Sequence, residues 1–377
     1  NENKVLNVPH LRFPEFNGEW ETKLINDLAV VIGGGTPDTT IKSYWDGEIQ
    51  WFTPSEIGKN KYVDSSLRTI TEEGLNNSSA KLLPPNTILL SSRATIGECS
   101  LSLRECATNQ GFQSLVSKKC YVDFLYYLIQ TKKRDLIRKS CGSTFLEISA
   151  NEVRKIQVSV PTDVEQQKIA GLLSLIDERI ATQNKIIEDL KKLKSAIRKK
   201  MFSLLKDEYT ESFEINQLLD YEQPTAYIVA NDEYSTDTSL TPVLTANKGF
   251  ILGYTDEKFG IYQKGECIIF DDFTMDAKYV SFPFKVKSSA IKILTAKPNV
   301  NLRFMFEYLS YWELKSEGHK RHYISEIASL VIELPSKERQ SIIASLMTSL
   351  NSKLDIEAKT KIRYEEQKRY LLSQMFI

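Results

Sequence analysis

The sequence has few of the residues that build metal sites, disulfide frameworks or membrane spans. It has three histidines and five cysteines in 377 residues, and no Cys-x-x-Cys pair occurs. An odd, scattered set of cysteines argues against a zinc site or a disulfide framework and favours reduced thiols. No run of about 18 apolar residues is present, and the polar start Asn1–Lys4 is unlike a signal peptide. We therefore expect a cytoplasmic protein without a membrane span.

The motifs of common catalytic sites are also missing. Gly33-Gly34-Gly35 lacks the third glycine of a dinucleotide loop, and no Gly-Lys-Ser/Thr is present to bind phosphate. The single Pro-Asp pair is not followed by the Glu-x-Lys of many nucleases, and no Asn/Asp-Pro-Pro-Tyr/Phe motif of amino-methyltransferases occurs. Asp271-Asp272 could bind a metal, but a turn or DNA-facing loop is favoured because no third carboxylate is placed beside them. We expect no catalytic residue, metal or cofactor on this chain.

The sequence does contain a long internal repeat. Nine residues recur 174 positions later: Pro161, Gln166, Ile169, Ala170, Leu172, Lys185, Lys194, Met201 and Phe202 correspond to Pro335, Gln340, Ile343, Ala344, Leu346, Lys359, Lys368, Met375 and Phe376. A shorter similarity precedes each copy, Gly142 with Ile148-Ser149 and Gly318 with Ile324-Ser325. The stretches between the copies do not match. This alternation indicates two unlike domains carried by two similar spacers.

Each copy has the pattern of a long coiled-coil helix. Apolar residues from Ile169 to Leu204, and again from Ile343 to Met375, alternate steps of four and three, which is the a/d pattern of helix-to-helix packing. A proline stands upstream of each copy, where it suits a helix entrance. The first run covers 36 residues, or about 54 Å of helix. We expect the two helices to pack antiparallel, with a pseudo-twofold relation between the halves.

Both a/d patterns are interrupted at equivalent places by polar residues. Gln183 and Lys194 in the first copy correspond to Glu357 and Lys368 in the second. Polar residues at such positions weaken packing but fix the register of the two helices.

Charge is unevenly distributed although the net charge is zero. Counting Lys and Arg against Asp and Glu, the numbers are 19 against 18 in residues 1–160 and 10 against 6 in residues 161–206. They are 12 against 20 in residues 207–334 and 8 against 5 in residues 335–377. The spacers are basic and the second variable segment is acidic. That acidity disfavours a DNA-binding protein that acts alone, because neutralised phosphates supply most non-specific affinity.

The first variable segment is expected to mix strands and helices. The patterns predict strands at 49–53 and 87–91 and a helix from Asp123 to Arg138. The second variable segment has a comparable end, with an apolar helix face formed by Phe304, Met305, Tyr308, Leu309 and Trp312.

An ordered set of short motifs runs through both halves of the chain. The motifs in the first half are Leu11 to Phe16 with Gly18-Glu19-Trp20, Gly34 to Pro37, Tyr44 to Gly47, Trp51 to Glu56, Arg93 to Gly97, Asn109 to Phe112, and Val160-Pro161 with Glu165 to Ala170. The motifs in the second half are Tyr221 to Thr225, Thr241 to Thr245, Phe270 to Thr274, and Leu334-Pro335 with Arg339-Gln340. In this order the motifs resemble a known family, the specificity subunits of type I restriction-modification systems, over nearly the whole chain. Ala94 departs from it, since glycine is usual there.

The resemblance implies a fold, a division into domains and a function. The fold is α+β, with two mixed α/β target recognition domains, 1–160 and 207–334, separated by spacer helices at 161–206 and 335–377. Each recognition domain would read one half of a bipartite double-stranded DNA site, and the helices would set the gap. Two methyltransferase subunits would dock on a non-catalytic chain, and restriction/translocase subunits would add to the complex. S-adenosylmethionine, ATP and magnesium are expected on those partners only.

Candidate DNA-contacting residues follow from the resemblance and from the loops in which polar side chains fall. Direct readout needs hydrogen-bonding side chains at base edges, and the candidates are Thr36, Thr53, Ser55, Ser92, Arg93 and Gln110 in the first domain and Gln223, Thr225, Tyr227, Thr245, Lys248, Thr274 and Lys278 in the second. Lys132, Lys133, Lys320 and Arg321 are better suited to phosphate contacts. Each of these residues would serve equally well in a turn or on a solvated helix face.

Two other classes of function remain open from the residues alone. One is a coiled-coil adaptor whose end domains bind protein. The other is an enzyme with an unrecognised site, which the absent motifs disfavour. Sequence-selective DNA binding separates the first from a specificity subunit, and a methylation assay on the isolated chain tests the second.

Overall fold

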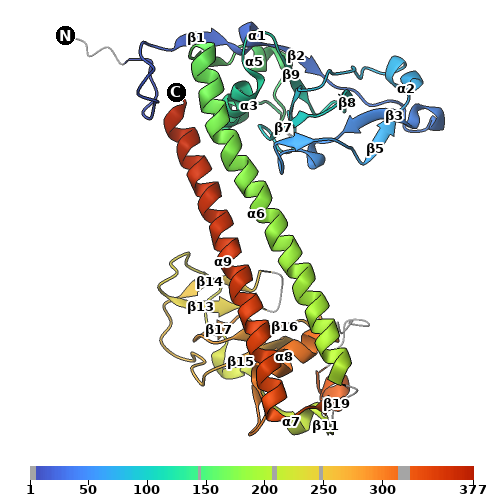
Figure 1. The fold of residues 1–377 in the computed structure, drawn as a ribbon, viewed down its shortest axis with the longest axis vertical. Coiled ribbons are helices and arrows are strands. Elements are labelled where there is room, and N and C mark those ends of the chain that lie inside the picture. Colours follow the sequence, from blue (N-terminus) through green and yellow to red (C-terminus); the bar gives the residue numbers. More distant parts are fainter. Residues whose placement is uncertain (1–5, 143–145, 206–209, 246–248, 313–322) are drawn as a thin grey trace. The chain divides into compact units, whose positions relative to one another are not determined.

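The chain forms two compact units that each contain part of both long helices. The computed structural model describes residues 6–142, 146–205, 210–245, 249–312 and 323–377. Unit 1 comprises residues 1–185 and 358–377, and unit 2 comprises residues 186–357. The long helices are α6 (Asp163–Leu204) and α9 (Lys337–Met375), drawn in green and red in Figure 1.

Unit 1 is a mixed α/β domain packed on the first part of α6 and the last part of α9. Its elements before α6 are β1 (Glu21–Leu24), α1 (Ile25–Leu28), β2 (Ala29–Gly33), β3 (Trp45–Phe52), β4 (Tyr62–Val63), β5 (Arg68–Ile70), α2 (Glu72–Asn76), β6 (Ile88–Leu90), β7 (Cys99–Ser102), β8 (Cys106–Thr108), β9 (Gln113–Ser117), α3 (Val122–Thr131), α4 (Lys133–Arg138), α5 (Ala150–Arg154) and β10 (Gln157–Val160). The strands form a five-stranded sheet ordered β2-β9-β6-β7-β4, a three-stranded sheet ordered β5-β3-β8, and the pair β1-β10.

Unit 2 has a different arrangement of strands on the remaining parts of the two helices. Its elements between α6 and α9 are β11 (Glu211–Glu214), α7 (Ile215–Leu218), β12 (Leu219–Glu222), β13 (Thr241–Leu244), β14 (Ile251–Thr255), β15 (Cys267–Asp271), β16 (Ala277–Val280), β17 (Lys285–Val286), β18 (Ile291–Ala296), α8 (Leu302–Tyr311) and β19 (Val331–Leu334). Its sheets are ordered β12-β18-β15-β16 and β14-β13-β17, with β11 paired to β19. The expected fold class, mixed α/β domains with two long helices, is confirmed.

The predicted strands are present, but the predicted helix over 123–138 is wrong in one respect. Residues 49–52 lie in β3 and 88–90 form β6, whereas the helix is divided into α3 and α4 at Lys132. The hydroxyl of Thr131 donates to the carbonyl of Leu128, which is the acceptor that the Lys132 N–H would use to continue α3. The Lys132 N–H bonds the carbonyl of Ile129 instead, and this tightened turn ends the helix.

The a/d positions of both long helices are buried or half-buried, with one exception at the end of α6. Leu204 is exposed, while its neighbours Phe202 and Leu205 are buried. The Phe202 ring packs on Phe304 and Tyr311, at centroid distances of 5.5 Å and 5.1 Å. The last turn of α6 is therefore oriented by aromatic side chains around α8, and the expected pattern stops one step early.

Repeated residues make the same contact in both units, which shows why they recur. In unit 1 the side chain of Gln166 donates to the carbonyl of Pro161 (3.0 Å) and accepts from the backbone N–H of Tyr121, which precedes α3 (2.9 Å). In unit 2 Gln340 donates to Pro335 (2.9 Å) and accepts from the N–H of Asn301, which precedes α8 (2.9 Å). Both glutamines are almost fully buried. Each one ties the entrance of a long helix to the start of the short helix beside it.

Other expectations concerned the cysteines and membrane spans. All five cysteines are free thiols. Among the described helices, none combines the length and apolarity needed to cross a bilayer.

Candidate nucleic-acid interface

Four loops of unit 1 meet at one edge of its sheets. Strands β3 and β8 are parallel neighbours, so the loops that follow them leave at the same edge. The N–H of Asn109 bonds the carbonyl of Phe52 (3.1 Å), and the N–H of Gly35, after β2, bonds the carbonyl of Thr108 (2.8 Å). The N–H of Ser92, after β6, bonds the carbonyl of Gly111 (2.8 Å). The fold thus brings together the four loops that carry all six candidate base-reading residues of the first half.

Polar side chains at this edge contact one another, both between loops and within one loop. The hydroxyl of Thr36 donates to the side-chain carbonyl of Gln110, and the hydroxyls of Thr53 and Ser55 lie 3.0 Å apart. Ser55 and Gln110 are exposed, and the two threonines are half-buried. Donors and acceptors of this kind suit base edges or phosphate oxygens.

Two buried tryptophans hold the loop after β2 by hydrogen bonds to its backbone. The indole N–H of Trp51 donates to the carbonyl of Gly35 (2.9 Å), and that of Trp45 donates to the carbonyl of Asp38 (3.1 Å). The loop also lies so close to the Ser79 backbone that a Cβ at Gly35 would be 2.5 Å from a carbonyl carbon. A bulkier residue does not fit there. The sequence showed the glycines as a turn but gave no signal that buried indoles hold it.

Glu56 organises the second loop. One of its carboxylate oxygens accepts hydrogen bonds from the N–H and the hydroxyl of Thr53, both at 2.7 Å. Its other oxygen accepts the N–H of Leu67 at 2.6 Å. A single side chain therefore fixes two neighbouring surface segments.

Ser92 and Arg93 are less available than the other candidates. Ser92 is fully buried, and its hydroxyl has no hydrogen-bond partner in the described part of the chain. Arg93 is ion-paired with Glu147 at 2.9 Å, with 41% of its side chain exposed. Ala94 has a φ of +54°, in the left-handed region, which accounts for glycine being usual in the family at this position. In this conformation Ser92 supports the loop from inside, and Arg93 keeps some surface for DNA.

The two lysines proposed as phosphate contacts already have partners in unit 1. Lys132 donates to the carbonyl of Ile377 (2.7 Å), and burial lowers its pKa. Lys133 is ion-paired with Glu98, beside the loop that carries Arg93. A phosphate would have to displace or share these contacts.

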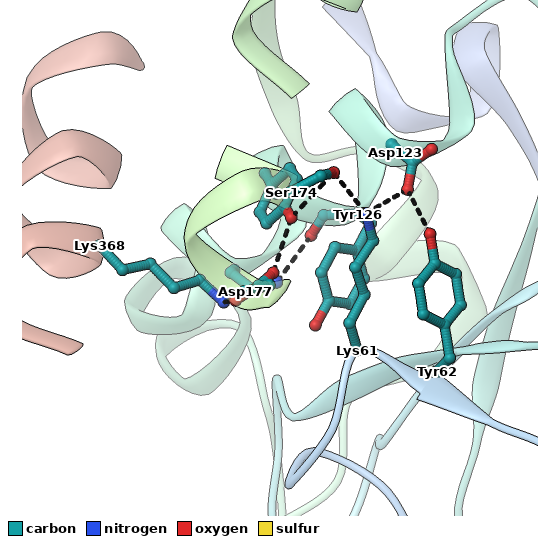
Figure 2. A network of polar contacts seen from close by, with 9 residues as sticks. Lys61, Tyr62, Asp123, Tyr126, Ser174, Asp177 and Lys368 are labelled. Atoms are coloured by element: carbon teal, nitrogen blue, oxygen red, sulfur yellow. Dashed lines mark hydrogen bonds and ion pairs between the residues drawn. The ribbon is translucent and has the colours of Figure 1, made fainter. Parts of the chain in front are cut away.

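A polar network fastens the domain of unit 1 to its two helix segments (Figure 2). Lys61 bridges Asp123, at 2.5 Å, and the hydroxyl of Ser174 on α6, at 2.7 Å. Asp177 of α6 binds Lys368 of α9 at 2.7 Å, and it accepts the phenolic hydroxyl of Tyr127 at 2.6 Å. Burial is the first cause that raises the pKa of Tyr127, so it remains a neutral donor.

In unit 2 the exposed candidates lie at one edge of the four-stranded sheet. Strands β12 and β15 are both antiparallel to β18, so they are parallel to each other and end at the same edge. Gln223 and Thr225 follow β12, and Thr274 lies in the turn after β15; all three are exposed. The fold thus brings these three polar loop residues to the same edge of the sheet.

Three other candidates in unit 2 are partly or wholly engaged. Thr245 is 7% exposed, and its N–H bonds the carbonyl of Phe250. Tyr227 is buried and donates its hydroxyl to Glu222 (2.7 Å), and burial is the first cause that raises its pKa. Lys278 is half-exposed and ion-paired with Asp276 at 2.9 Å. Lys248, Lys320 and Arg321 lie outside the described residues.

The acidic pair at 271–272 forms a turn, as the sequence favoured. One oxygen of Asp271 accepts the N–H groups of Phe273 (2.8 Å) and Thr274 (3.2 Å). Asp272 faces the buried ammonium of Lys292 at 3.5 Å. No group of three or more His, Cys, Asp or Glu residues placed to hold a metal occurs among the described residues. The two carboxylates are thus occupied in shaping the loop that presents Thr274.

Comparisons with known proteins identify the family. The model of the type I restriction modification DNA specificity domain matches residues 17–192 and again residues 208–366. Because these two matches span most of the chain, the chain belongs to this family.

Curated relatives agree with the family match. The chain is 38% identical over 216 residues to the type I restriction enzyme MjaIX specificity subunit of Methanocaldococcus jannaschii, covering 56% of this chain and 50% of that protein. It is 39% identical over 178 residues to the EcoR124I/EcoR124II specificity subunit of Escherichia coli, covering 42% and 43%. The matched stretches thus span about half of these relatives. The EcoprrI specificity subunit of Escherichia coli is 24% identical over 357 residues, covering 85% and 84%.

A solved structure shares the fold over nearly its whole length. The specificity subunit of the type I restriction-modification system from M. genitalium is 17% identical, covers 98% of this chain and 99% of its own, and superposes with a TM-score of 0.64. A chain from a structure on complex assembly of the type I restriction-modification system covers 96% and 98%, with 13% identity and a TM-score of 0.57. At these identities the similarity establishes the fold alone.

Proposed function

We propose that this chain is the DNA-specificity subunit of a type I restriction-modification complex. Each recognition domain reads one half of a bipartite duplex site, and the spacer helices set the gap between the halves. The chain itself is non-catalytic. The observation that carries the proposal is that the specificity-domain family matches both halves of the chain, while each half also places exposed polar candidates, such as Gln110 and Thr274, at one edge of its sheets.

The division into modules follows the sequence repeat. Residues 1–160 and 207–334 are proposed as the recognition domains, and residues 161–206 and 335–377 as the spacers. The base-reading residues are proposed to be the exposed or half-exposed members of the predicted set. Thr36, Thr53, Ser55, Arg93 and Gln110 serve the first half-site. Gln223, Thr225, Thr274 and Lys278 serve the second.

Partners supply the chemistry and much of the phosphate binding. Residues 207–334 carry eight more acidic than basic residues, 20 against 12. Phosphate neutralisation dominates affinity for DNA, so this half needs help from another subunit. Two methyltransferase subunits that bind S-adenosylmethionine are proposed to dock on the chain, and restriction/translocase subunits that use ATP and magnesium complete the complex.

Methylome sequencing of the host with and without the gene tests the proposal. Loss of the gene should abolish adenine methylation at one bipartite motif and leave other motifs unchanged. A host whose methylome does not change would contradict the proposal, provided that the methyltransferase gene is expressed. Exchange of residues 20–160 for another recognition domain should then alter one half of the motif and keep the other half and the gap. Alteration of both halves together would contradict the modular division.

A further inference from the structure

Two large apolar side chains project from the described surface far more than the others. Leu67 in unit 1 is 85% exposed and Phe259 in unit 2 is 88% exposed. Isolated apolar residues on a surface are common and by themselves mean little. These two differ because there is one in each recognition domain, each on a rigidly held backbone beside candidate base-reading residues.

The backbone on both sides of Leu67 is fixed by buried or half-buried groups. The Leu67 N–H donates to Glu56 at 2.6 Å. The hydroxyl of Ser66 donates to the carbonyl of Arg68 at 2.6 Å, and the Ser66 N–H donates to the side chain of Gln50 at 2.7 Å. A flexible loop tip would have no such set of partners. Leu67 is therefore held outward by the fold.

The backbone at Phe259 is held by a buried ion pair. Its carbonyl accepts the ammonium of Lys285 at 2.6 Å, and Lys285 is paired with Glu257 at 2.7 Å. The Lys285 side chain is 4% exposed. Gly260 follows with a φ of +60°, and a Cβ there would lie 2.5 Å from the carbonyl of Ala226. The loop is thus clamped against the residue next to Thr225, with the phenyl ring outside.

Each apolar side chain is linked directly to a proposed DNA-reading segment. The carboxylate of Glu56 that holds Leu67 also holds the N–H and hydroxyl of Thr53. The loop of Phe259 packs on the 3₁₀ turn Pro224–Tyr227, which carries Thr225. Displacing either apolar residue would displace its polar neighbour as well.

We propose that Leu67 and Phe259 are apolar base contacts, one for each half of the DNA site. The inference rests on the proposed function and adds to it a kind of contact that the polar candidates cannot make. Leucine and phenylalanine contact thymine methyl groups in the major groove, or enter between base steps from the minor groove. The desolvation of an almost bare phenyl ring or isobutyl group supplies the free energy.

Positive groups beside both side chains favour DNA as the occupant. The Arg68 guanidinium stacks on the Trp45 ring, 3.5 Å from its centroid, next to Leu67. Lys258 is exposed next to Phe259. A cation adjacent to an apolar side chain matches a groove, where phosphates flank the bases. Lysine is depleted in protein interfaces, so Lys258 beside Phe259 favours a DNA groove over a protein partner.

Affinity measurements on the complete complex of this chain with its methyltransferase subunits test the inference. The probes are a duplex that carries the motif found by methylome sequencing and duplexes with one half scrambled. Phe259→Ala should weaken binding to the motif at least about fivefold and reduce discrimination for one half only, because the lost contact is to bases. Leu67→Ala should do the same for the other half. The slope of affinity against salt should stay unchanged, since no phosphate contact is removed.

Matched variants and further outcomes make the result decisive. Val331→Ala on β19, 61% exposed, and Val30→Ala on β2, 42% exposed, remove apolar surface elsewhere and should bind like the wild type. Phe259→Leu should restore most of the affinity, which also shows that the loop is intact.

Variants that keep wild-type affinity and discrimination would overturn the inference. So would variants that lose methyltransferase subunits while DNA discrimination is kept. If the wild-type complex itself does not prefer the motif, it is the proposed function that fails.

Discussion

The two units solve the same packing problem with different charges. Lys368 in unit 1 and Lys194 in unit 2 are repeat equivalents at polar a/d positions. Lys368 binds Asp177 at 2.7 Å, and Lys194 donates to Asn351 at 2.5 Å. Asp177 and Asn351 are also repeat equivalents, 174 residues apart. The lysine has kept its place in both copies, while its partner on the opposite helix is charged in one and neutral in the other.

In unit 2 the acidic side chain of this region is supplied by the short helix α8 and not by a long helix. Glu307 on α8 is fully buried, accepts the Asn351 amide at 3.4 Å and is ion-paired with Arg198 at 2.7 Å. The residue at the matching place on α3 of unit 1 is Tyr127, which donates its hydroxyl to Asp177. The acidic group thus lies on the long helix α6 in unit 1 and on the short helix α8 in unit 2.

This difference indicates that each domain is matched to its own helix segments. A domain with tyrosine at the Glu307 position would leave the half-buried Arg198 without its counter-ion. A domain with glutamate at the Tyr127 position would set a second carboxylate beside that of Asp177. Both arrangements are strongly unfavourable at low exposure. Modular exchange of domains should therefore succeed within one position and fail between positions.

The largest effect is expected from changing the helix register in one helix only. Two residues inserted after Gln183 rotate the rest of α6 by about 200°, so the Asp177–Lys368 and Lys194–Asn351 contacts cannot both form. Four residues inserted after both Gln183 and Glu357 leave the helix faces within about 40° of their original direction and add about 6 Å. The matched insertion should fold and select the same half-sites with a gap longer by one or two base pairs, at about 3.4 Å each.

Circular dichroism and methylome sequencing measure these two outcomes. A matched insertion that folds but keeps the original gap would show that the helices do not set the spacing. A two-residue insertion that leaves both units stable would show that the polar contacts do not fix the register.

Removal of the buried acid is expected to destabilise unit 2 more than the corresponding change destabilises unit 1. Glu307→Gln leaves Arg198 without its counter-ion, and the Glu307 side chain is fully buried. The loss should cost about 3–5 kcal/mol of stability. Asp177→Asn replaces the ion pair by a hydrogen bond from Lys368 to the one amide oxygen, while the amide N–H can donate to the Tyr127 hydroxyl, and it should cost about 1–3 kcal/mol. Hydrogen exchange of peptides from α8 and α3 reports each unit separately. Equal losses of stability in the two variants would contradict the proposed difference between the units.

In unit 1, two compensating substitutions should recover part of the stability that Tyr127→Glu removes. Tyr127→Glu alone places a second carboxylate next to Asp177 and should cost about 2 kcal/mol or more. Adding Asp177→Asn and Leu372→Arg reproduces the arrangement of unit 2, because Leu372 is the repeat equivalent of Arg198. The triple variant should be more stable than Tyr127→Glu, with a favourable interaction energy in the mutant cycle. Additive losses would mean that the matched charges are not coupled.

The smallest effect is expected for the lysines themselves. Lys194→Met should be nearly neutral, since Asn351 is uncharged and Glu307 keeps its ion pair with Arg198. Lys368→Met leaves Asp177 without its cation and should be destabilising. Burial is the first cause that lowers the pKa of Lys194. The folded state therefore binds the Lys194 proton less tightly than the unfolded state, whose pKa is near 10.5. As the pH rises toward 10.5, Lys194 loses its proton first in the folded state, and the free energy of unfolding increases.

Urea denaturation of wild type and Lys194→Met between pH 8 and pH 10.5 tests this sign. The rise should be larger in the wild type than in the variant, which keeps only the contribution of other lysines with a lowered pKa, such as Lys132. A wild-type stability that falls over the same range relative to the variant would contradict it.

Sequence alone predicted the elements whose pattern is periodic or repeated. The a/d spacing predicted both long helices and the half-buried lysines within them, because a residue every three or four positions marks one face of a helix. The repeat of Pro161-Gln166 as Pro335-Gln340 indicated two equivalent helix entrances, and each glutamine does bond the start of the adjacent short helix. The motif order predicted the family that the comparisons show.

Several local features could not be predicted because they depend on neighbours distant in the chain. Nothing in the local sequence indicates that the Ser92 hydroxyl is buried or that the Trp51 indole holds the Gly35 carbonyl. The break of the predicted helix at Lys132 depends on which donor takes the Leu128 carbonyl, and Thr131 takes it. Such choices are decided by competition among hydrogen-bond partners once the chain is packed.

By itself, the sequence determined which residues of each long helix lie on its packed face, since helical periodicity is a local property of the chain. The tertiary structure alone decided which charge neutralises each half-buried lysine and which loops meet at the sheet edges. Asp177 lies on α6 and is ion-paired with Lys368, whereas Glu307 lies on α8, is ion-paired with Arg198 and acts electrostatically on the nearby Lys194. Only packing reveals this, because burying a charge is favourable solely when the fold brings an opposite charge or a hydrogen-bond partner to it.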